Sequence, residues 1–290
     1  MYGAILGDII GSPYEGERAY TKNFPLFRKR SHFTDDTVMT MAVADALLSV
    51  SNNAEEDEIK NATIQYMRIL GNRTGKAGYG RAFRKWLKSE NPQPYKSYGN
   101  GSAMRVSAVG WLYDNLYRTR EVARWTAEVT HNHSEGIKGA ESVAAAIYLA
   151  RCGNSKEEIK NYIEREFDYD LSRTIEQIRS DYQIEVSCQK SVPESIIAFL
   201  EATDFEDTIR NAIWLGGDAD TQAAIAGSIA EAFYKVSNEL KLECQKRLPK
   251  EFIAILKKFE NELKNKNSPT IRPDRMDRFT WRDGDLKIIK

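Results

Sequence analysis

Cysteine is scarce in this chain, and its few positions exclude a fold built on disulfides. Of the 290 residues only three are cysteines, at Cys152, Cys188 and Cys244. They are odd in number and far apart, and they form no Cys-x-x-Cys pair, so no disulfide framework is implied. We expect reduced thiols in the core of a cytoplasmic protein.

Net charge and long apolar runs are also absent. Lysine plus arginine and aspartate plus glutamate both number 42, so the formal net charge is +0. This balance argues against a general nucleic-acid or membrane-surface binder, because such proteins need a basic face. The chain has no run of about 18 or more apolar residues, and its first residues lack the basic region of a signal peptide. We therefore expect a soluble, cytoplasmic protein without a membrane partner, and a monomer.

Strand-like alternation is almost absent, and no repeat of fixed period occurs, which favours an all-α fold. Hydrophobic residues make up 41% of the chain, enough for a sizeable core. The pattern predicts one helical domain over residues 1–264 and a tail, 265–290, that wraps the surface or is partly disordered. A brief extended piece is expected at 183–188. The expected helices span 2–12, 35–50, 56–70, 81–87, 106–117, 121–129, 137–151, 155–166, 171–182, 193–202, 205–214, 222–234 and, as one or two helices, 239–264.

Two acidic motifs stand at the start of apolar helices. The first acidic motif is Thr-Asp-Asp-Thr at residues 34–37, where Thr34 is placed as the N-cap. The second acidic motif is Gly-Gly-Asp-Ala-Asp-Thr at residues 216–221, and the helix that follows it is rich in alanine. The small residues of this second helix are typical of a central helix packed on several sides.

Helix capping explains either motif alone, because first-turn carboxylates complement the helix dipole. Two such motifs, each leading into a helix too apolar to face solvent, favour a cation instead. Four carboxylates at buried helix ends repel one another unless they are protonated or neutralised. Carboxylate, hydroxyl and carbonyl oxygens are the ligands that Mg²⁺, Mn²⁺ and Ca²⁺ prefer. A metal site is therefore the preferred interpretation.

Two further acidic residues lie near the N-terminus. Asp8 is inside a helix in which Gly3, Gly7 and Gly11 recur at helical spacing, and this spacing predicts the close approach of another helix. An internal hydrogen-bonding role and a catalytic role both remain open for Asp8. Glu15 follows in a loop, where it is free to face a cleft and act as a catalytic acid or base. The alternative is an ordinary solvated glutamate.

Two glycine-containing loops are candidate ligand loops. Residues 71–80 lack the residue order of a P-loop, and a mobile surface loop is the alternative. Residues 97–105 gather backbone N–H groups before an apolar helix, which suits a diphosphate or another anion, whereas a tight Asn-Gly turn is the alternative. His131 and His133 form no zinc pattern, so we expect them to cap a helix or contact a substrate.

Together these motifs resemble those of the ADP-ribosylglycohydrolase family, the group that contains dinitrogenase-reductase-activating glycohydrolase. They follow the family's order over nearly all of residues 2–235. The resemblance implies a compact, orthogonal multi-helix domain that binds ADP-ribose. The matching segments are Gly7-Asp-Ile-Ile-Gly11 with Glu15, Thr34-Asp-Asp-Thr37, Gly78-Tyr-Gly80, Ser97-Tyr-Gly-Asn-Gly-Ser-Ala-Met-Arg105, Thr130-His131 and Gly216-Gly-Asp-Ala-Asp-Thr221.

The resemblance also implies roles for individual residues. Two Mg²⁺ ions, with Mn²⁺ as a possible substitute, would lie between the two acidic motifs. Glu15 matches a glutamate with an acid–base role, and Asp220 would bridge the ions. The implied metal ligands are Thr34, Asp35, Asp36, Asp218, Asp220 and Thr221. The implied substrate-binding residues are Gly78, Tyr79, Gly80, Ser97, Tyr98, Gly99, Asn100, Gly101, Ser102, Met104 and His131.

The activity implied is a Mg²⁺-dependent hydrolase that cleaves the C1″ glycosidic or ester bond of ADP-ribosylated proteins or small molecules and releases ADP-ribose. A non-catalytic ADP-ribose-binding or structural relative is one alternative, and a binuclear-metal nucleotide phosphohydrolase is another. The linkage, whether to arginine, serine or O-acetyl-ADP-ribose, is left open. Gln222 stands where an aliphatic residue is expected, and it could reach the metal site or the leaving group. Residues 155–190 and the tail after 265 carry no motif that we can assign.

Overall fold

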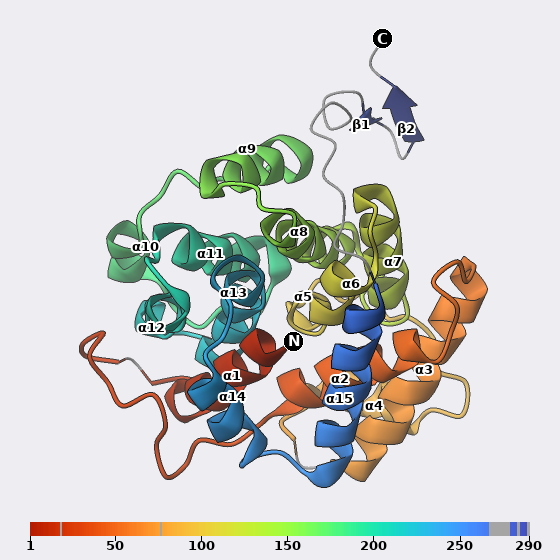
Figure 1. The fold of residues 1–290 in the computed structure, drawn as a ribbon, viewed down its shortest axis with the longest axis horizontal. Helices are drawn as coiled ribbons and strands as arrows, with labels where there is room; N and C mark the ends of the chain where they lie inside the picture. The colour runs from red at the N-terminus through yellow and green to blue at the C-terminus, as the bar shows by residue number, and fades with distance from the viewer. Residues whose placement is uncertain (18, 76, 267–278, 283–284, 289–290) are drawn as a thin grey trace.

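The computed structural model describes residues 1–17, 19–75, 77–266, 279–282 and 285–288 (Figure 1). A 3-10 turn, η1 (Ser12–Tyr14), follows the first helix, and β1 (Phe279–Arg282) pairs antiparallel with β2 (Asp285–Ile288). The helices are α1 (Tyr2–Gly11), α2 (Asp35–Leu48), α3 (Glu56–Arg73), α4 (Arg81–Lys88), α5 (Gly101–Met104), α6 (Ser107–Leu112), α7 (Leu116–Glu128), α8 (Ser134–Arg151), α9 (Lys156–Phe167), α10 (Ile175–Asp181), α11 (Cys188–Glu201), α12 (Phe205–Leu215), α13 (Ala219–Tyr234), α14 (Asn238–Gln245) and α15 (Lys250–Asn265).

The predicted all-α class is confirmed, since every regular element described before residue 267 is helical. An isolated bridge between Gly99 and Ser187 matches the extended piece expected at 183–188. The hairpin of β1 and β2 was not predicted for the tail. The prediction for residues 267–278 lies outside the described residues.

The predicted helix 106–117 is wrong in its extent, because two helices share this range. The helix α6 ends at Leu112, and Tyr113 has an extended backbone. The side chain of Asn115 accepts a hydrogen bond from the N–H of Arg118 at 3.1 Å, which caps a new helix, α7, from Leu116 onward. A capping residue inside the apolar stretch therefore divides it.

The predicted start of α11 near Pro193 is also wrong, because the helix begins at Cys188 and contains the proline. A tertiary contact sets the start instead, since the N–H of Cys188 donates to the carbonyl of Tyr98 at 2.8 Å. α10 is shorter than its predicted range, 171–182, because Thr174 caps it with a capping box.

The centre of the fold is the pair α1 and α13. Every residue of α13 from Ala219 to Ala230 is buried, as expected for a central helix. A Cβ on Gly7 would lie 2.1 Å from the carbonyl oxygen of Ala223, and one on Gly3 would lie 2.0 Å from that of Gly227. The glycine spacing in α1 therefore predicted this close approach correctly, because only hydrogen fits between the two backbones.

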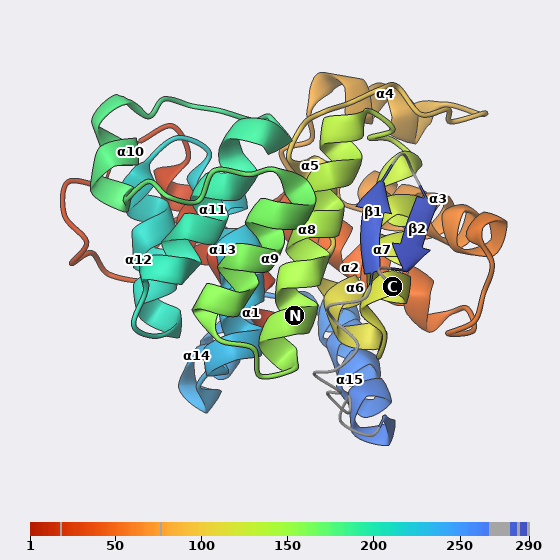
Figure 2. The same cartoon turned by 90° about the horizontal axis from the view of Figure 1, so that it is seen from above.

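The remaining helices pack around this pair in two groups (Figures 1 and 2). α8, α11 and α12 pack on α13, whereas α2 packs on α1, α3 and α15. α2 and α13 begin at the junction between the groups, so the fold brings their N-termini together. This junction places both acidic motifs at one site.

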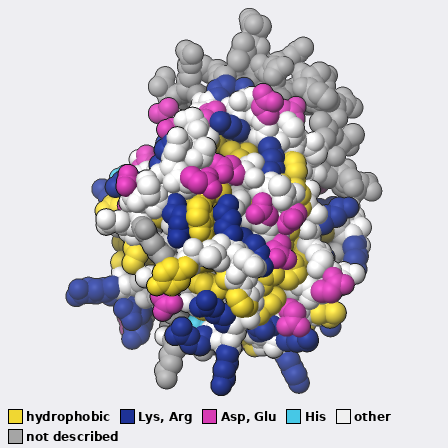
Figure 3. Space-filling model, turned by 90° about the vertical axis from the view of Figure 1, so that its left-hand side faces the viewer, with side chains coloured by type: hydrophobic (Ala, Val, Ile, Leu, Met, Phe, Trp, Pro, Cys, Tyr) yellow, Lys and Arg dark blue, Asp and Glu magenta, His cyan; other side chains and the backbone are white. Residues whose placement is uncertain are grey.

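The surface and the cysteines agree with the composition. Acidic and basic side chains alternate across the face shown in Figure 3, and lysines and arginines project from its lower rim. All three cysteines are buried and unbridged. In the part of the chain that the structure describes, no helix is long and apolar enough to cross a bilayer.

Candidate active site

The two acidic motifs, far apart in the sequence, meet where α2 and α13 begin. Thr34 is the N-cap of α2, and Asp218 is the N-cap of α13. The hydroxyl of Thr221 donates to Asp36 Oδ2 at 3.2 Å and joins the motifs directly. The tertiary structure thus turns two helix starts into one cluster of oxygens.

Two overlapping groups of carboxylates result. Asp8, Asp36 and Asp220 each offer one oxygen within 4.8 Å of the others, and all three residues are buried. Glu15, Asp218 and Asp220 form a second group by the same measure. Asp220 belongs to both groups, so it lies between the two motifs. At these separations one cation can contact several carboxylates.

Asp8 holds the start of α2 in place. Its carboxylate accepts hydrogen bonds from the backbone N–H groups of Thr34 and Thr37, at 2.9 and 3.0 Å. It also accepts from their two hydroxyls, at 2.8 and 2.5 Å. Asp8 therefore has the internal hydrogen-bonding role that the sequence left open, and it caps a helix other than its own.

Burial and mutual repulsion raise the pKa values of these carboxyls. Burial raises the pKa of Asp35 to about 7, with the charge of Asp8 as the next cause. Burial, followed by the charge of Asp220, raises the pKa of Asp36 well above its usual range. The pKa of Asp220 is raised by burial and then by the charge of Asp218. The fold thus concentrates negative charge where water cannot screen it.

This donor set fits a hard divalent cation. In the described chain Asp36 Oδ1 is buried and has no hydrogen-bond partner, although such an atom ordinarily finds one. All the neighbouring donors are oxygens, with no cysteine or histidine in either carboxylate group. A bound cation would satisfy the free oxygen and neutralise the repulsion that raises the pKa values.

Glu15 lies in the loop after η1, at the exposed edge of the cluster. The N–H of Gly16 donates to the carbonyl of Gly217 at 3.1 Å, which ties this loop to the second acidic motif. Desolvation in the cleft raises the pKa of Glu15, with the negative charge of Asp218 as the second cause. A carboxyl whose pKa is raised by its surroundings is therefore placed beside the cluster.

A cleft of about 490 Å³ extends from the carboxylates, a volume typical of a ligand pocket. The predicted site residues that line it are Glu15, Thr34, Asp35, Asp36, Gly78, Gly80, Ser97, Gly99, Asn100, Gly101, Met104, His131, Asp218, Asp220 and Thr221. The cleft is thus formed by both acidic motifs and both glycine-containing loops.

Tyr79 is the predicted site residue that the structure turns into the core. Its ring lies 5.3 Å from that of Phe83, and its hydroxyl is 3.0 Å from that of Thr74. Burial raises the pKa of Tyr79 to about 12. Its neighbour Gly78 has φ +106°, and a Cβ there would lie 2.9 Å from Asp35 Oδ1. In this loop Gly78 faces the site, whereas Tyr79 anchors the loop to the core.

Two residues of the second loop also lie away from the cleft. Ser102 is buried, and its hydroxyl donates to the carbonyl of Gly136 at 2.6 Å. The side chain of Tyr98 is 52% exposed, and its ring lies 5.4 Å from that of His133. Asn100 reaches the site instead, because its Nδ2 donates to Asp218 Oδ2 at 2.7 Å.

The two histidines divide the roles expected of them. His133 caps α8 by accepting a hydrogen bond from the N–H of Glu135 at 3.1 Å. His131 lines the cleft, and its Nδ1 lies 2.7 Å from the Thr130 hydroxyl. Burial, and then the charge of Arg105, lower the pKa of His131 well below its usual range. A neutral imidazole therefore faces the cleft.

Gln222 does not reach the cleft, which corrects the sequence-based suggestion. Its side chain is fully buried, and Nε2 donates to the carbonyls of Gly216 at 2.8 Å and Asp218 at 3.1 Å. Gly216 and Gly217 both have positive φ, at 85° and 78°. Gln222 therefore holds a left-handed turn in the second acidic motif.

Several residues that line the cleft were missed by sequence reasoning. The sequence carries only a weak signal for these residues, because a single aromatic or basic residue outside a motif has many ordinary structural roles. Arg105 is the exception, since it ended a matched segment; its buried guanidinium donates to Thr130 Oγ1 at 2.9 Å. The missed residues are His32, Met39, Ala77, Arg81, Ala82, Phe83, Tyr95, Arg105 and Val186.

Fold and site together define an all-α domain whose ligand-sized cleft is lined by an acidic, oxygen-rich cluster. Residues 1–267 match the sequence profile of the ADP-ribosylglycohydrolase family. The chain therefore belongs to the ADP-ribosylglycohydrolase family, and the resemblance seen in its motifs is confirmed.

Individual relatives agree with this assignment. ADP-ribosylhydrolase ARH3 of Homo sapiens is 27% identical over 305 residues, covering 81% of this chain and 84% of the relative. ADP-ribosylarginine hydrolase Tri1 of Pseudomonas putida is 25% identical over 268 residues, covering 82% and 70%. A solved structure titled "ADP-ribosylglycohydrolase-related protein complex" superposes with a TM-score of 0.66 at 24% identity, covering 90% of this chain and 95% of that one. The last likeness shows the fold.

Proposed function

We propose that this chain is a Mg²⁺-dependent hydrolase that cleaves the C1″ bond of ADP-ribosylated proteins or small molecules and releases ADP-ribose. Membership of the family supports the substrate class, as do relatives named for hydrolysis of ADP-ribose linkages. The observation that carries the proposal is the meeting of the two acidic motifs beside Glu15, with a buried free oxygen on Asp36.

The residues proposed to hold two Mg²⁺ ions come from both motifs. Bound there, the ions would polarise ribose oxygens or a water molecule at the scissile bond. Asp36 supports this assignment most directly, because its free Oδ1 lacks a protein donor. The proposed ligands are Thr34, Asp35, Asp36, Asp218, Asp220 and Thr221, and Mn²⁺ is the expected substitute.

Glu15 is the proposed acid–base residue. Its exposed position lets it reach the bond that breaks, and its raised pKa lets it hold a proton nearer neutral pH than a free glutamate does. The carboxyl would protonate the departing atom or accept a proton from water. Positive charge that develops at C1″ during cleavage is tolerated by the anionic surroundings.

The part of the cleft lined by the glycine-containing loop at 97–105 is proposed to hold the ADP portion. Gly101 and neutral His131 line the cleft there, and the aromatic rings of Tyr95 and Phe83 also line the cleft. Rings can stack on a base, and backbone N–H groups can bind a diphosphate. A nearby nitrogen of His131 leaves little room at Gly101, where a Cβ would lie 3.2 Å from Nε2.

The test is release of ADP-ribose from arginine-, serine- and O-acetyl-linked substrates, with Mg²⁺ and with EDTA. Mg²⁺-dependent release from one substrate is the expected result and would name the linkage. Release of phosphate would indicate the phosphohydrolase alternative, and tight ADP-ribose binding without turnover would indicate a binding protein. Glu15→Gln is the matched variant: it should lose turnover and keep affinity for ADP-ribose, and an unchanged rate would remove Glu15 from the mechanism.

A further inference from the structure

Residues 182–187, which we call the strap, connect α10 to α11 along the edge of the cleft. The carbonyl of Val186 accepts a hydrogen bond from the N–H of Asn100 at 2.8 Å. The N–H of Cys188 donates to the carbonyl of Tyr98 at the same distance, and Gly99 and Ser187 form an antiparallel bridge. The strap is thus paired to the glycine-containing loop of the cleft by its backbone.

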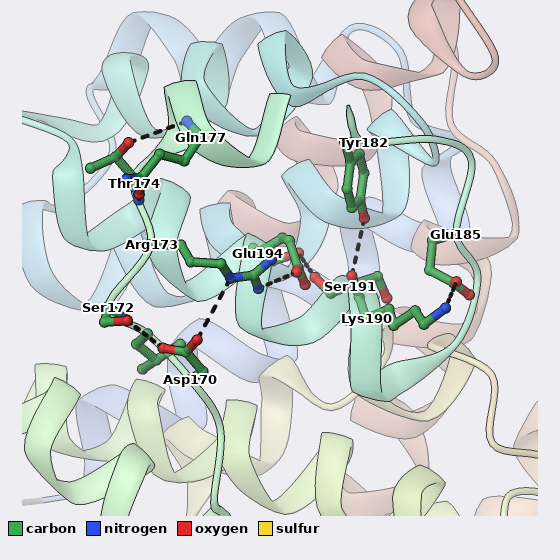
Figure 4. A network of polar contacts seen from close by, with 12 residues as sticks. Asp170, Ser172, Arg173, Thr174, Gln177, Tyr182, Glu185, Lys190, Ser191 and Glu194 are labelled. Atoms are coloured by element: carbon green, nitrogen blue, oxygen red, sulfur yellow. Dashed lines mark hydrogen bonds and ion pairs between the residues drawn. The ribbon is translucent and has the colours of Figure 1, made fainter. Parts of the chain in front are cut away.

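Side chains anchor the strap on its other side (Figure 4). The hydroxyl of Tyr182 donates to the carbonyl of Lys190 at 3.3 Å. Glu185 accepts from the N–H of Ser187 at 2.9 Å and forms an ion pair with Lys190 at 3.5 Å. The one charged group of the strap, the Glu185 carboxylate, is therefore paired with Lys190, and the segment is held at both ends.

The strap lies beside the Glu15 loop and the second acidic motif, in addition to the glycine-containing loop at 97–105. A Cβ on Gly16, next to Glu15, would lie 3.8 Å from Ile184 Cδ1. A Cβ on Gly217, next to Asp218, would lie 2.9 Å from the ring of Tyr182. Val186 lines the cleft itself. The strap consequently runs from the loop of Glu15 along the edge of the ligand pocket.

Two apolar side chains of the strap face solvent despite these anchors. Ile184 is 66% exposed and Val186 is 58% exposed, and Tyr98 on the paired loop is 52% exposed. These are three of the seven large hydrophobic side chains that are exposed in the described chain. Their gathering on two paired segments is a sign of an interaction surface, whereas single exposed apolar residues are ordinary.

We propose that the strap is the contact surface for the leaving side of the substrate, and that Ile184 packs on an apolar side chain next to the ADP-ribosylated residue of a protein. This inference rests on the proposed function. When ADP-ribose fills the cleft, whatever it is attached to must emerge beside Glu15, where Ile184 stands. The carboxylates there offer no apolar contact, and the charge that the strap carries is already paired. A substrate residue that meets the strap is therefore selected for apolar character.

The test uses two ADP-ribosylated peptides that share the modified residue and the active linkage but carry leucine or glycine beside it. A partly buried leucine should raise kcat/KM about 5- to 10-fold over the glycine peptide in the unaltered protein. Ile184→Ser should bring this ratio close to one. Ile184→Lys should reverse it in favour of a third peptide that carries glutamate at the same position. Leu242→Ser is the matched control, because Leu242 is 59% exposed on α14 and should leave the ratio unchanged.

Each outcome separates the strap from the proposed function. Equal rates on the leucine and glycine peptides in the unaltered protein would overturn the strap proposal while supporting the hydrolase. The strap proposal is also overturned if Ile184→Ser keeps the preference or slows both peptides alike. If a small-molecule linkage is cleaved but no peptide releases ADP-ribose, the strap proposal alone is overturned. If neither peptides nor small molecules release ADP-ribose, the proposed function is overturned, and the strap proposal with it.

Discussion

The two acidic motifs present similar oxygens, yet the fold holds them in different ways. The first is fixed from outside its helix, by the buried carboxylate of Asp8 on α1, which accepts four hydrogen bonds from Thr34 and Thr37. The second is fixed by neutral amides, since Gln222 and Asn100 donate to its backbone and to Asp218. The first motif therefore depends on a neighbouring helix, α1, whereas the second depends largely on a residue of its own helix, α13.

This difference has a physical reason. Asp8 occupies the donors at the start of α2, so the carboxylates of the first motif are left to face the cluster. The side chain of Asp218 makes no capping hydrogen bond to α13. Two glycines at positive φ turn the backbone before this helix instead. Such a turn is open to other conformations unless a donor pins it, which is what Gln222 does. The variants below test this comparison.

Asp8→Leu should have the largest effect. Four buried donors would lose their acceptor, so we expect a loss of about 4 kcal/mol in the free energy of unfolding and little remaining Mg²⁺ binding. Urea denaturation in EDTA measures the first quantity. Asp8→Asn keeps one acceptor oxygen, so its free energy of unfolding should lie between those of Asp8→Leu and the unaltered protein. A loss below about 1 kcal/mol for Asp8→Leu would show that the first motif stands without α1.

Removal of the metal should have the next largest effect. At Mg²⁺ concentrations about 100 times the Kd, binding should add about 2.7 kcal/mol to the free energy of unfolding. Asp220→Asn and Asp35→Asn should each abolish this gain together with turnover. Thermal unfolding with Mg²⁺ and with EDTA provides the measurement. Full activity in metal-stripped protein, or in either variant, would contradict the binuclear assignment.

Gln222→Leu should cost about 2 kcal/mol of stability, because the Gly216 carbonyl loses its buried donor while the shape is nearly kept. We expect Mg²⁺ affinity to fall about tenfold as Asp218 loses its fixed position. Titration calorimetry reports that affinity apart from activity. Should stability fall while affinity stays the same, Gln222 would support the helix and not the motif.

His131 makes the smallest predicted contribution, which depends on pH. Its folded pKa is lowered, so below about pH 6.5 the unfolded chain binds a proton that the folded protein resists. As the pH is lowered below about 6.5, the free energy of unfolding should decrease by up to about 1.4 kcal/mol per pH unit. Above about pH 6.5 this effect is absent. We would measure denaturation in EDTA at pH 7.5 and at pH 5.5. Between these two pH values, the free energy of unfolding should decrease by about 1 kcal/mol less in His131→Gln than in the unaltered protein. An equal decrease in both proteins would show that a group other than His131 takes up the proton.

Some of the fold could be predicted from local pattern alone. Helical periodicity identified most helices, and glycine spacing in α1 predicted its contact with α13. Boundaries were less predictable where a cap or a tertiary bond competes with propensity, as at Asn115 and at the start of α11. Such competition depends on neighbours that no local window contains.

The site divides in the same way. Family motifs identified most of the residues that line the cleft, but a motif does not say in which direction each side chain points. Tyr79 and Ser102 belong to matched segments and yet turn inward, because buried partners are available to each. Asp8 was left with two open roles, since its four donors come from residues 26 and 29 positions away.

The sequence by itself determined the helical class, the family and the oxygen chemistry of the site, because periodicity and residue type are local properties. Only the tertiary structure decided that the two helix starts meet, that Asp8 and Gln222 hold them, and that the strap lies beside Glu15. These are relations between segments far apart in the chain. They depend on how closely helices pack, and packing is settled by the whole core.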